Sequence, residues 1–297
     1  MNTVLSISAN NPAEPNNLQS DVRVFSSHGV HGKCVIAALP AISEDNSVLN
    51  HPVASGLIES QVDVAMGGLQ LRIWKVGELS SIYSIGEVST AIRKHEISSV
   101  IFNPVLLNAG TEFYQNEIID SLVLDLLPLS RLVVLTKHNA AYLLENSDKS
   151  AGSRALAQEL HDIGANGVFI IDTPDEGSFE YVDVFLDGGV ITEIRSPIIA
   201  KNIKDGLDST LSASIAAHLA KGVRLEQAVQ QGREYLTAVI ASSGADEKHA
   251  EKFGLDHMLG KVAIEKPETA LRSLSDTSGE IATLSKYMDM IEDSDRE

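Results

Sequence analysis

Residues 202–213 read Asn-Ile-Lys-Asp-Gly-Leu-Asp-Ser-Thr-Leu-Ser-Ala, which predicts the exit of a strand, a polar loop with one glycine, and the start of a helix. Such a loop can place backbone N–H groups and a helix N-terminus against a phosphate. Phosphate-binding loops usually contain several glycines, because the backbone must approach the anion closely. Here Leu207 stands between Asp205 and Asp208. The segment is therefore either a working anion site or the remnant of one.

Outside this segment, short apolar runs alternate with stretches of helical periodicity. We expect strands at Val4–Ile7, Val35–Leu39, Leu69–Trp74, Ser99–Phe102, Leu132–Leu135 and Gly167–Ile171. Helices are expected from Leu18 to about His28, and at Pro52–Val64, Ile85–His95, Phe113–Leu126 and Arg154–Ile163. This alternation predicts an α/β fold with a mostly parallel sheet and helices on both faces.

The last third of this pattern changes character. Asp187-Gly188-Gly189 separates two strand-like runs, Tyr181–Leu186 and Val190–Ile194, which predicts a hairpin. Two further helices are expected at Thr210–Ala220 and Leu225–Ala241. In open parallel sheets, ligands bind at the carboxyl ends of the strands. The loops expected around one crevice are Ser8–Asn17, Asn103–Val105, Thr136–Ala141 and Asn202–Ser209.

Composition narrows the functional class. The chain has 297 residues, of which 43% are hydrophobic, and a net charge of -18 that would repel a nucleic-acid backbone. No apolar run approaches the roughly 18–20 residues that span a bilayer, and no signal peptide is indicated. The single cysteine, Cys34, is expected in the core and excludes an intrachain disulfide. We therefore expect a cytoplasmic protein without nucleic-acid or membrane partners.

The histidines do not indicate a metal centre. His28 and His31 lie three residues apart, but no cysteine or carboxylate stands near them at the spacing of metal ligands. No transition-metal site is expected from this pattern.

The C-terminal segment is charged and less periodic than the rest. We place a domain boundary near residue 243, with a main domain at 1–243 and an extension at 244–297. Within the extension, 281–291 could form one amphipathic helix. The extension is interpreted as an appended helical arm, with docking of a protein partner as the alternative.

Several motifs resemble those of the hydroxymethylpyrimidine and phosphomethylpyrimidine kinases. The stretches that carry the resemblance are Ser8–Asp21, Phe25–Gly32, Lys75–Leu79, Asn103–Val105 and the helices between Thr210 and Ala238. The similarity covers about residues 3–243 and implies a ribokinase-like, three-layer α/β/α fold. It also implies ATP and Mg²⁺ as cofactors, a small-molecule ligand and homodimer formation. The family phosphorylates a hydroxymethyl group on a pyrimidine for thiamine biosynthesis.

The resemblance also implies roles for individual residues. The catalytic position falls on Asp208 when counted from Asn202, and on Ser209 when counted back from Thr210. Asp208 could act as a base, whereas Ser209 would only weakly replace the family's cysteine. Helix capping is the structural alternative for both. The substrate-binding positions fall on Asn11 and Ile42, and the nucleotide or anion positions include Thr136, Lys204 and Gly206.

The chain departs from the family pattern in four places. The family's Gly-Gly-Ala-Gly falls on Glu14-Pro15-Asn16-Asn17, and its pyrimidine-reading glutamine falls on Ile42, which cannot supply that hydrogen bond. Its magnesium-organising glutamate falls on Ala141, and its strand-end Lys-Gly-Gly falls near Ile171-Asp172-Thr173. Lys137 or Lys204 could compensate for the missing lysine.

The anion loop itself adds a further departure. Asp205 would place a negative charge beside an incoming phosphate, at a cost of about 4 kcal/mol for a separation of ~4 Å and an effective dielectric of ~20. These changes favour weak, altered or lost pyrimidine kinase activity. The alternatives are a non-catalytic ligand sensor or partner-binding protein, or a kinase for another hydroxymethyl heterocycle such as pyridoxal.

Overall fold

The computed structural model describes residues 2–11, 18–42, 48–104, 116–144, 151–172, 180–198 and 206–244, together with Leu255 and His257. Its strands form one sheet of nine in the order β3-β2-β1-β4-β5-β6-β7-β8-β9. The strands are β1 (Thr3–Ala9), β2 (His31–Ile42), β3 (Val48–Pro52), β4 (Ile73–Val76), β5 (Ser99–Phe102), β6 (Leu132–Thr136), β7 (Gly167–Ile171), β8 (Glu180–Asp187) and β9 (Val190–Pro197). The run from β2 to β7 is parallel, while β3, β8 and β9 pair antiparallel with their neighbours.

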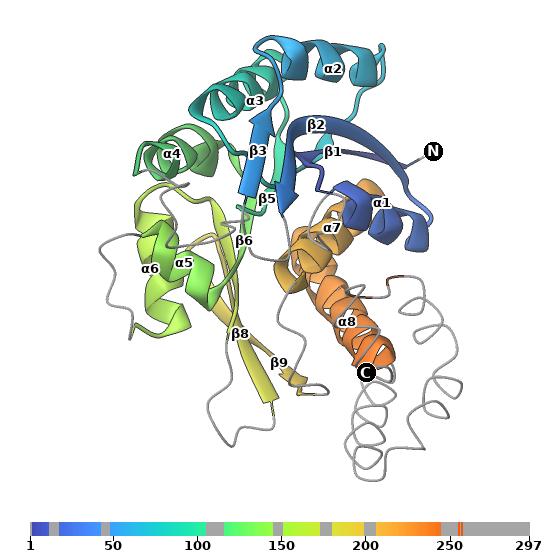
Figure 1. The fold of residues 1–297 in the computed structure, drawn as a ribbon. Coiled ribbons are helices and arrows are strands. Elements are labelled where there is room, and N and C mark those ends of the chain that lie inside the picture. The colour runs from blue at the N-terminus through green and yellow to red at the C-terminus, as the bar shows by residue number, and fades with distance from the viewer. Residues whose placement is uncertain are drawn as a thin grey trace.

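Helices cover both faces of this sheet (Figure 1). One face carries α2 (Leu57–Met66), α3 (Ile82–Lys94), α4 (Asn116–Ser121), α5 (Lys137–Leu143) and α6 (Ser153–Asp162). A short π-helical turn, Leu122–Leu126, and a 3₁₀ turn, Leu127–Leu129, continue α4. The other face carries α1 (Leu18–Ser27), α7 (Leu207–Ala220) and α8 (Leu225–Gly244). The predicted α/β class, with a mostly parallel sheet and helices on both faces, is confirmed.

Each face of the sheet has its own apolar core, because successive residues of a strand point to opposite sides. On β6, Val133 and Leu135 face the α2–α6 layer, whereas Leu132 and Val134 face α1, α7 and α8. All four side chains are fully buried. Strands buried on both faces read as continuous apolar runs, which is why this strand could be predicted from sequence.

The structure corrects several predicted boundaries. The helix expected at Pro52–Val64 begins only at Leu57, because Pro52 pairs with Ala38 in β3, a strand that was not predicted. The strand expected at Leu69–Trp74 begins later, at Ile73. Leu71 is buried outside the strand, and its carbonyl accepts a hydrogen bond from the Trp74 indole. The helix α5 was also missed.

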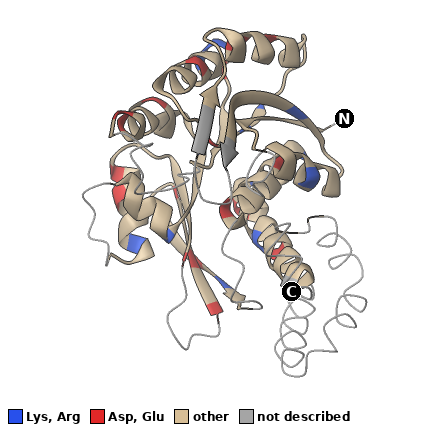
Figure 2. Cartoon of the chain, in the orientation of Figure 1, with Lys and Arg blue, Asp and Glu red and all other residues tan. Residues whose placement is uncertain are grey.

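The prediction that Cys34 lies in the core is wrong, because its side chain is exposed. In the described chain β3 pairs only with Ala38–Ile42, so no strand flanks the first half of β2 on its outer side. Charged residues of both signs are distributed along the helices and the β8–β9 hairpin (Figure 2). On the hairpin, Arg195 forms ion pairs with Glu180 and Glu193.

Candidate active site

Four polar side chains interrupt the apolar pattern where the central strands face α7. Strand alternation puts Ser6 and Ser8 of β1 and Lys75 of β4 on that face, and Asn103 follows the end of β5. All four are fully buried. Buried polar groups need partners, and these residues find them on α1, on α7 and on the neighbouring strands.

Lys75 and Asp21 form an ion pair at the centre of this face. The Lys75 Nζ lies 3.0 Å from Asp21 Oδ1, and both side chains have no solvent exposure. Asp21, on α1, accepts a second hydrogen bond from the Ser6 hydroxyl at 2.5 Å. The sequence analysis placed Asp21 and Lys75 in stretches that resemble the family, but it gave neither a role in the site. A lysine within a buried strand was the signal that it has a buried acidic partner.

Ser209, on α7, joins this network. Its hydroxyl lies 3.4 Å from Lys75 Nζ and 3.5 Å from Asp21 Oδ1, and the residue is fully buried. These contacts place Ser209 where it holds the first turn of α7 against β4 and α1. Its catalytic role stays a prediction. Its side chain packs against Lys75 and Asp21, which does not favour contact with a substrate.

Gly77, directly after β4, allows this network to form. A Cβ at this position would lie 2.5 Å from Ser8 Oγ and 3.1 Å from Lys75 Nζ. The Ser8 hydroxyl in turn accepts a hydrogen bond from the Glu78 backbone N–H at 3.0 Å. A side chain at residue 77 would therefore displace the two polar groups that organise the end of β4.

Asp208 lies in the first turn of α7 and is 6% exposed. Its Oδ1 accepts the backbone N–H of Ser209 at 2.9 Å, and its Oδ2 accepts a hydrogen bond from Asn139 Nδ2 at 3.3 Å. Asn139 belongs to α5, on the opposite layer of helices. The carboxylate thus lies between the two helical layers, where the predicted crevice should be. The sequence analysis placed Asn139 in the loop Thr136–Ala141 expected at this crevice, but it gave Asn139 no role of its own.

Burial raises the pKa of Asp208, because it removes the charged form from water. Hydrogen bonding by Asn103 and by the Ser209 amide, and the positive charge of Lys75, act in the opposite direction. The net effect moves the pKa of this carboxyl toward neutrality. A raised pKa makes a carboxylate a stronger proton acceptor.

Gly206 begins α7 in the left-handed conformation, with φ of 84°. This backbone geometry is readily available to glycine, and its carbonyl accepts the first helical bond from the Thr210 N–H at 2.9 Å. No side chain caps the helix at this position. The arrangement suits an anion at the helix N-terminus, although Asp208 occupies the same turn. Lys204 and Asp205 lie outside the described residues.

Asn103 has one buried polar atom without a hydrogen-bond partner among the described residues. Its Nδ2 donates to the Val134 carbonyl at 3.1 Å, while its buried Oδ1 has no hydrogen-bond partner within the described chain. An amide oxygen left without a partner in a polar crevice fits a water or a hydrated Mg²⁺.

Asn11, one of the predicted substrate residues, is 1% exposed and follows β1. Ile42 ends β2, and its side chain lies outside the description.

The predicted nucleotide side lies at the junction of β6 and α5. Thr136 caps α5, with its Oγ1 accepting the backbone N–H of Asn139 at 3.2 Å. Lys137 Nζ lies 3.4 Å from Asp172 Oδ1, and these side chains are 30% and 22% exposed. The resemblance puts the family's Lys-Gly-Gly near Asp172. Lys137, which could compensate for the missing lysine, is therefore paired with an acidic residue at this strand end.

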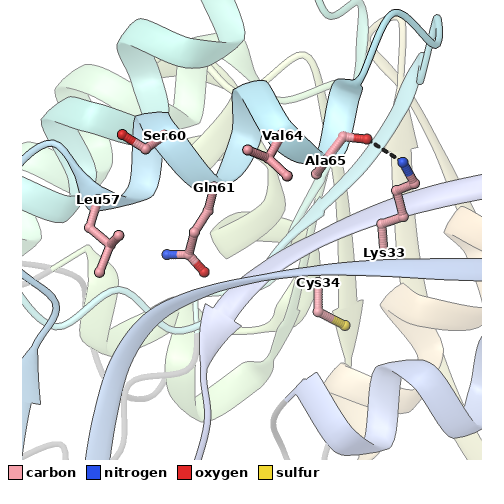
Figure 3. Close-up of a pocket in the computed structure, with 7 residues that line it drawn as sticks. All are labelled: Lys33, Cys34, Leu57, Ser60, Gln61, Val64 and Ala65. Carbon is pink, nitrogen blue, oxygen red and sulfur yellow. Dashed lines mark hydrogen bonds between the residues drawn. The ribbon is translucent and has the colours of Figure 1, made fainter.

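A separate pocket of about 510 Å³ lies between β2 and α2 (Figure 3). Its lining consists of Lys33, Cys34, Leu57, Ser60, Gln61, Val64 and Ala65. Gln61 exchanges two 3.0 Å hydrogen bonds with the backbone of Ile36, so it takes the place of a neighbouring strand at that residue. This pocket contains none of the predicted site residues.

No cluster of three or more His, Cys, Asp or Glu side chains among the described residues could hold a metal ion. Among the same residues, no helix has the length and apolar character needed to cross a membrane.

The arrangement of sheet and helices is that of solved vitamin kinases. The ADP complex of Bacillus subtilis pyridoxal kinase matches with a TM-score of 0.75 and 23% identity, over 82% of this chain and 92% of that chain. Phosphomethylpyrimidine kinase from Clostridium difficile 630 matches with a TM-score of 0.69 and 21% identity, over 81% and 100% respectively. The class is therefore the ribokinase-like α/β fold, as predicted.

Sequence similarity then identifies the family. The sequence model of phosphomethylpyrimidine kinase matches residues 17–253. Hydroxymethylpyrimidine/phosphomethylpyrimidine kinase of Rhizobium meliloti (strain 1021) is 28% identical over 243 residues, which is 80% of this chain and 90% of the relative. Pyridoxine kinase of Bacillus subtilis (strain 168) is 25% identical over 249 residues, or 82% and 92%. The chain belongs to the phosphomethylpyrimidine kinase family.

Proposed function

We propose that this protein is an ATP-dependent kinase that phosphorylates a hydroxymethyl group on a small heterocycle, with Asp208 as its general base. The observation that carries the proposal is the Asp208 carboxylate, buried at the start of α7 and hydrogen-bonded to Asn139 of the facing layer. Sequence alone left the catalytic position open between Asp208 and Ser209. The Ser209 hydroxyl contacts Lys75 and Asp21, on the side of α7 that packs on the sheet and α1, which favours Asp208.

The chemistry requires a group that accepts the proton of the attacking alcohol. In this role Asp208 would accept the proton of the hydroxymethyl oxygen that takes up the terminal phosphoryl group of ATP, with ADP as the leaving group. The burial that raises the pKa of Asp208 strengthens it as a proton acceptor. Lys75, held by Asp21, keeps a positive charge behind the carboxylate and offsets part of the cost of ionising it. Asn139 and Asn103 hold the Asp208 carboxylate in one orientation.

The residues of this chain fit a nucleotide in part. ATP with Mg²⁺ supplies the phosphoryl group and neutralises its developing charge. The first turn of α7 after Gly206, in which Asp208 already accepts the Ser209 N–H, would hold a phosphate. The unpartnered Asn103 Oδ1 would bind a water of the hydrated metal. The Lys137–Asp172 pair and Ala141 offer no strong additional contact. We therefore expect weak nucleotide binding.

The acceptor class follows from the relatives. One is a hydroxymethylpyrimidine/phosphomethylpyrimidine kinase and another is a pyridoxine kinase. Ile42 stands where the glutamine that recognises the pyrimidine is expected. This favours an acceptor whose recognition depends less on hydrogen bonds to its ring. We include a pyridoxal-like alcohol beside the pyrimidine for this reason. Cytoplasmic location and homodimer formation stay predictions.

The test is turnover with a panel of acceptors. The purified protein is incubated with ATP–Mg²⁺ and hydroxymethylpyrimidine, its phosphate, or pyridoxal, and ADP and phosphorylated product are measured. Asp208→Asn should lower the rate by about 10²-fold or more. Asp63→Asn, on the exposed face of α2, is the matched control and should keep the rate.

Failure has a defined meaning in this experiment. If no acceptor raises ADP release above the acceptor-free rate, the kinase proposal fails, and the non-catalytic ligand sensor becomes the better interpretation. If turnover occurs and Asp208→Asn does not slow it, Asp208 is not the base.

A further inference from the structure

Two residues of the C-terminal extension are buried in the main domain. Leu255 is 3% exposed and His257 is 2% exposed. Leu255 belongs to the apolar core that α1, α7 and α8 form on their face of the sheet. The boundary predicted near residue 243 therefore does not mark the last residue that packs on this core.

His257 makes hydrogen bonds to both long helices of that layer. Its Nε2 lies 3.0 Å from Thr210 Oγ1 on α7, and its backbone carbonyl accepts the Tyr235 hydroxyl of α8 at 2.9 Å. Thr210 and Tyr235 are each 1% exposed. The Tyr235 hydroxyl also lies 2.9 Å from Ser27 Oγ at the end of α1. One residue of the extension thus connects to the three helices that cover this face.

Thr210 is two residues from Asp208, in the same first turn of α7. The start of a helix opens most easily, because its first N–H groups lack partners one turn earlier. The Thr210 hydroxyl is hydrogen-bonded to His257, which lies outside the helix, whereas the Thr210 N–H donates to the Gly206 carbonyl within it. A contact at this place restricts the turn that carries Asp208 and begins at Gly206.

We propose that His257, supported by Leu255, is a positioning residue of the candidate site, which holds the first turn of α7 in the geometry that binds phosphate. Leu255 and His257, two residues of the extension, then support the site. This inference rests on the proposed kinase function for its consequence, but the contact itself can be tested without any turnover. Pre-organised groups bind more tightly, because less conformational freedom is lost on binding.

The experiment uses point variants in the full chain. His257→Leu keeps an apolar volume but removes the hydrogen bond, Thr210→Val removes the same bond from the other side, and His257→Gln restores a group that can reach Thr210. The matched control is Thr237→Val, a buried threonine of α8 whose hydroxyl bonds Arg233 and not His257. Two measurements are made: amide hydrogen exchange at residues 209–211, and binding of the ATP analogue AMP-PCP with Mg²⁺ by calorimetry.

We expect His257→Leu and Thr210→Val each to speed exchange at residues 209–211 by about tenfold and to weaken AMP-PCP binding by a similar factor. The double variant should be no worse than either single one, because both remove the same bond. His257→Gln should recover most of the loss. Thr237→Val should leave exchange at residues 209–211 unchanged.

Two results would overturn the inference. One is unchanged exchange at residues 209–211 in both His257→Leu and Thr210→Val. The other is an increase in exchange that is uniform over the chain, which means that His257 only contributes to global stability. If the unmodified protein does not bind AMP-PCP, the proposed function is contradicted, while the exchange data still decide whether His257 positions α7.

Discussion

The α7 side of the candidate site is closed to solvent, whereas the α5 side is half-exposed, and each contains a lysine–aspartate pair. Lys75 and Asp21 are 3.0 Å apart with no exposure. Lys137 and Asp172 are 3.4 Å apart, with 30% and 22% of their side chains exposed. The same chemistry therefore operates in two dielectric environments. Removing one partner leaves an uncompensated charge in the first case, but only a hydrated side chain in the second.

The two sides should therefore tolerate substitutions to different degrees. On the α7 side, Asp21, Lys75 and Ser209 depend on one another, since the loss of any of them leaves a buried polar group without its partner. On the α5 side, Ala141 stands where the resemblance implies a glutamate, and this position leaves no buried charge without a partner. Half-exposed positions tolerate such changes, because water satisfies what the protein no longer does.

The largest expected effect is the loss of the buried pair. Lys75→Met should lower the free energy of unfolding by about 4 kcal/mol, because Asp21 is left charged and buried. Urea denaturation followed by circular dichroism measures this change. Combining Lys75→Met with Asp21→Leu should recover much of the loss, since the double variant buries no charge. A loss below about 1 kcal/mol in Lys75→Met would mean that the two pairs are energetically alike.

An intermediate effect is expected at Asp208. Burial raises its pKa above the ordinary 3.8, so the folded state binds its proton more tightly than the unfolded state does. The folded state therefore loses stability as the pH rises from about 3.8 through the raised pKa. Asp208→Asn removes this cost and should be more stable than the unmodified protein by about 1 kcal/mol at pH 7.

The stability difference at Asp208 should shrink as the pH falls toward 3.8, where the carboxyl is protonated in both states. This difference is measured by thermal unfolding of both proteins between pH 4 and pH 8, with a Tm determined at about every half pH unit. Asp63→Asn is again the control, because the pKa of Asp63 is lowered, chiefly by its hydrogen bond with Lys94. A pH-independent difference at Asp208 would show that burial does not destabilise its charge.

The smallest effect is expected for the exposed pair. Lys137→Met should change the free energy of unfolding by less than about 1 kcal/mol, because water already screens both charges. Asp172→Asn should release Lys137 from its ion pair and tighten AMP-PCP binding by about a few-fold at low salt. A gain of this size matches the free energy of one solvent-screened charge interaction. Calorimetry at two salt concentrations measures this gain. A large loss of stability in Lys137→Met would erase the contrast between the two sides.

Much of the fold could be predicted from sequence because its signals are local. The buried strand at Leu132–Thr136, the hairpin around Gly188 and the two long helices after Gly206 each follow from periodicity and turn residues. The missed strand β3 pairs with β2, and this pairing places Pro52 opposite Ala38. Propensity alone cannot predict such a pairing.

The sequence by itself determined the layered α/β class, the family, and the places where the family's glycines and polar residues are missing. Only the tertiary structure decided that Asp208 contacts Asn139 of α5 and that Ser209 contacts Lys75 of β4, because these contacts depend on which side of one helical turn faces each element. It also brought His257 onto Thr210, 47 residues away along the chain. Contacts between distant segments depend on how whole elements pack, and no local pattern of residues encodes them.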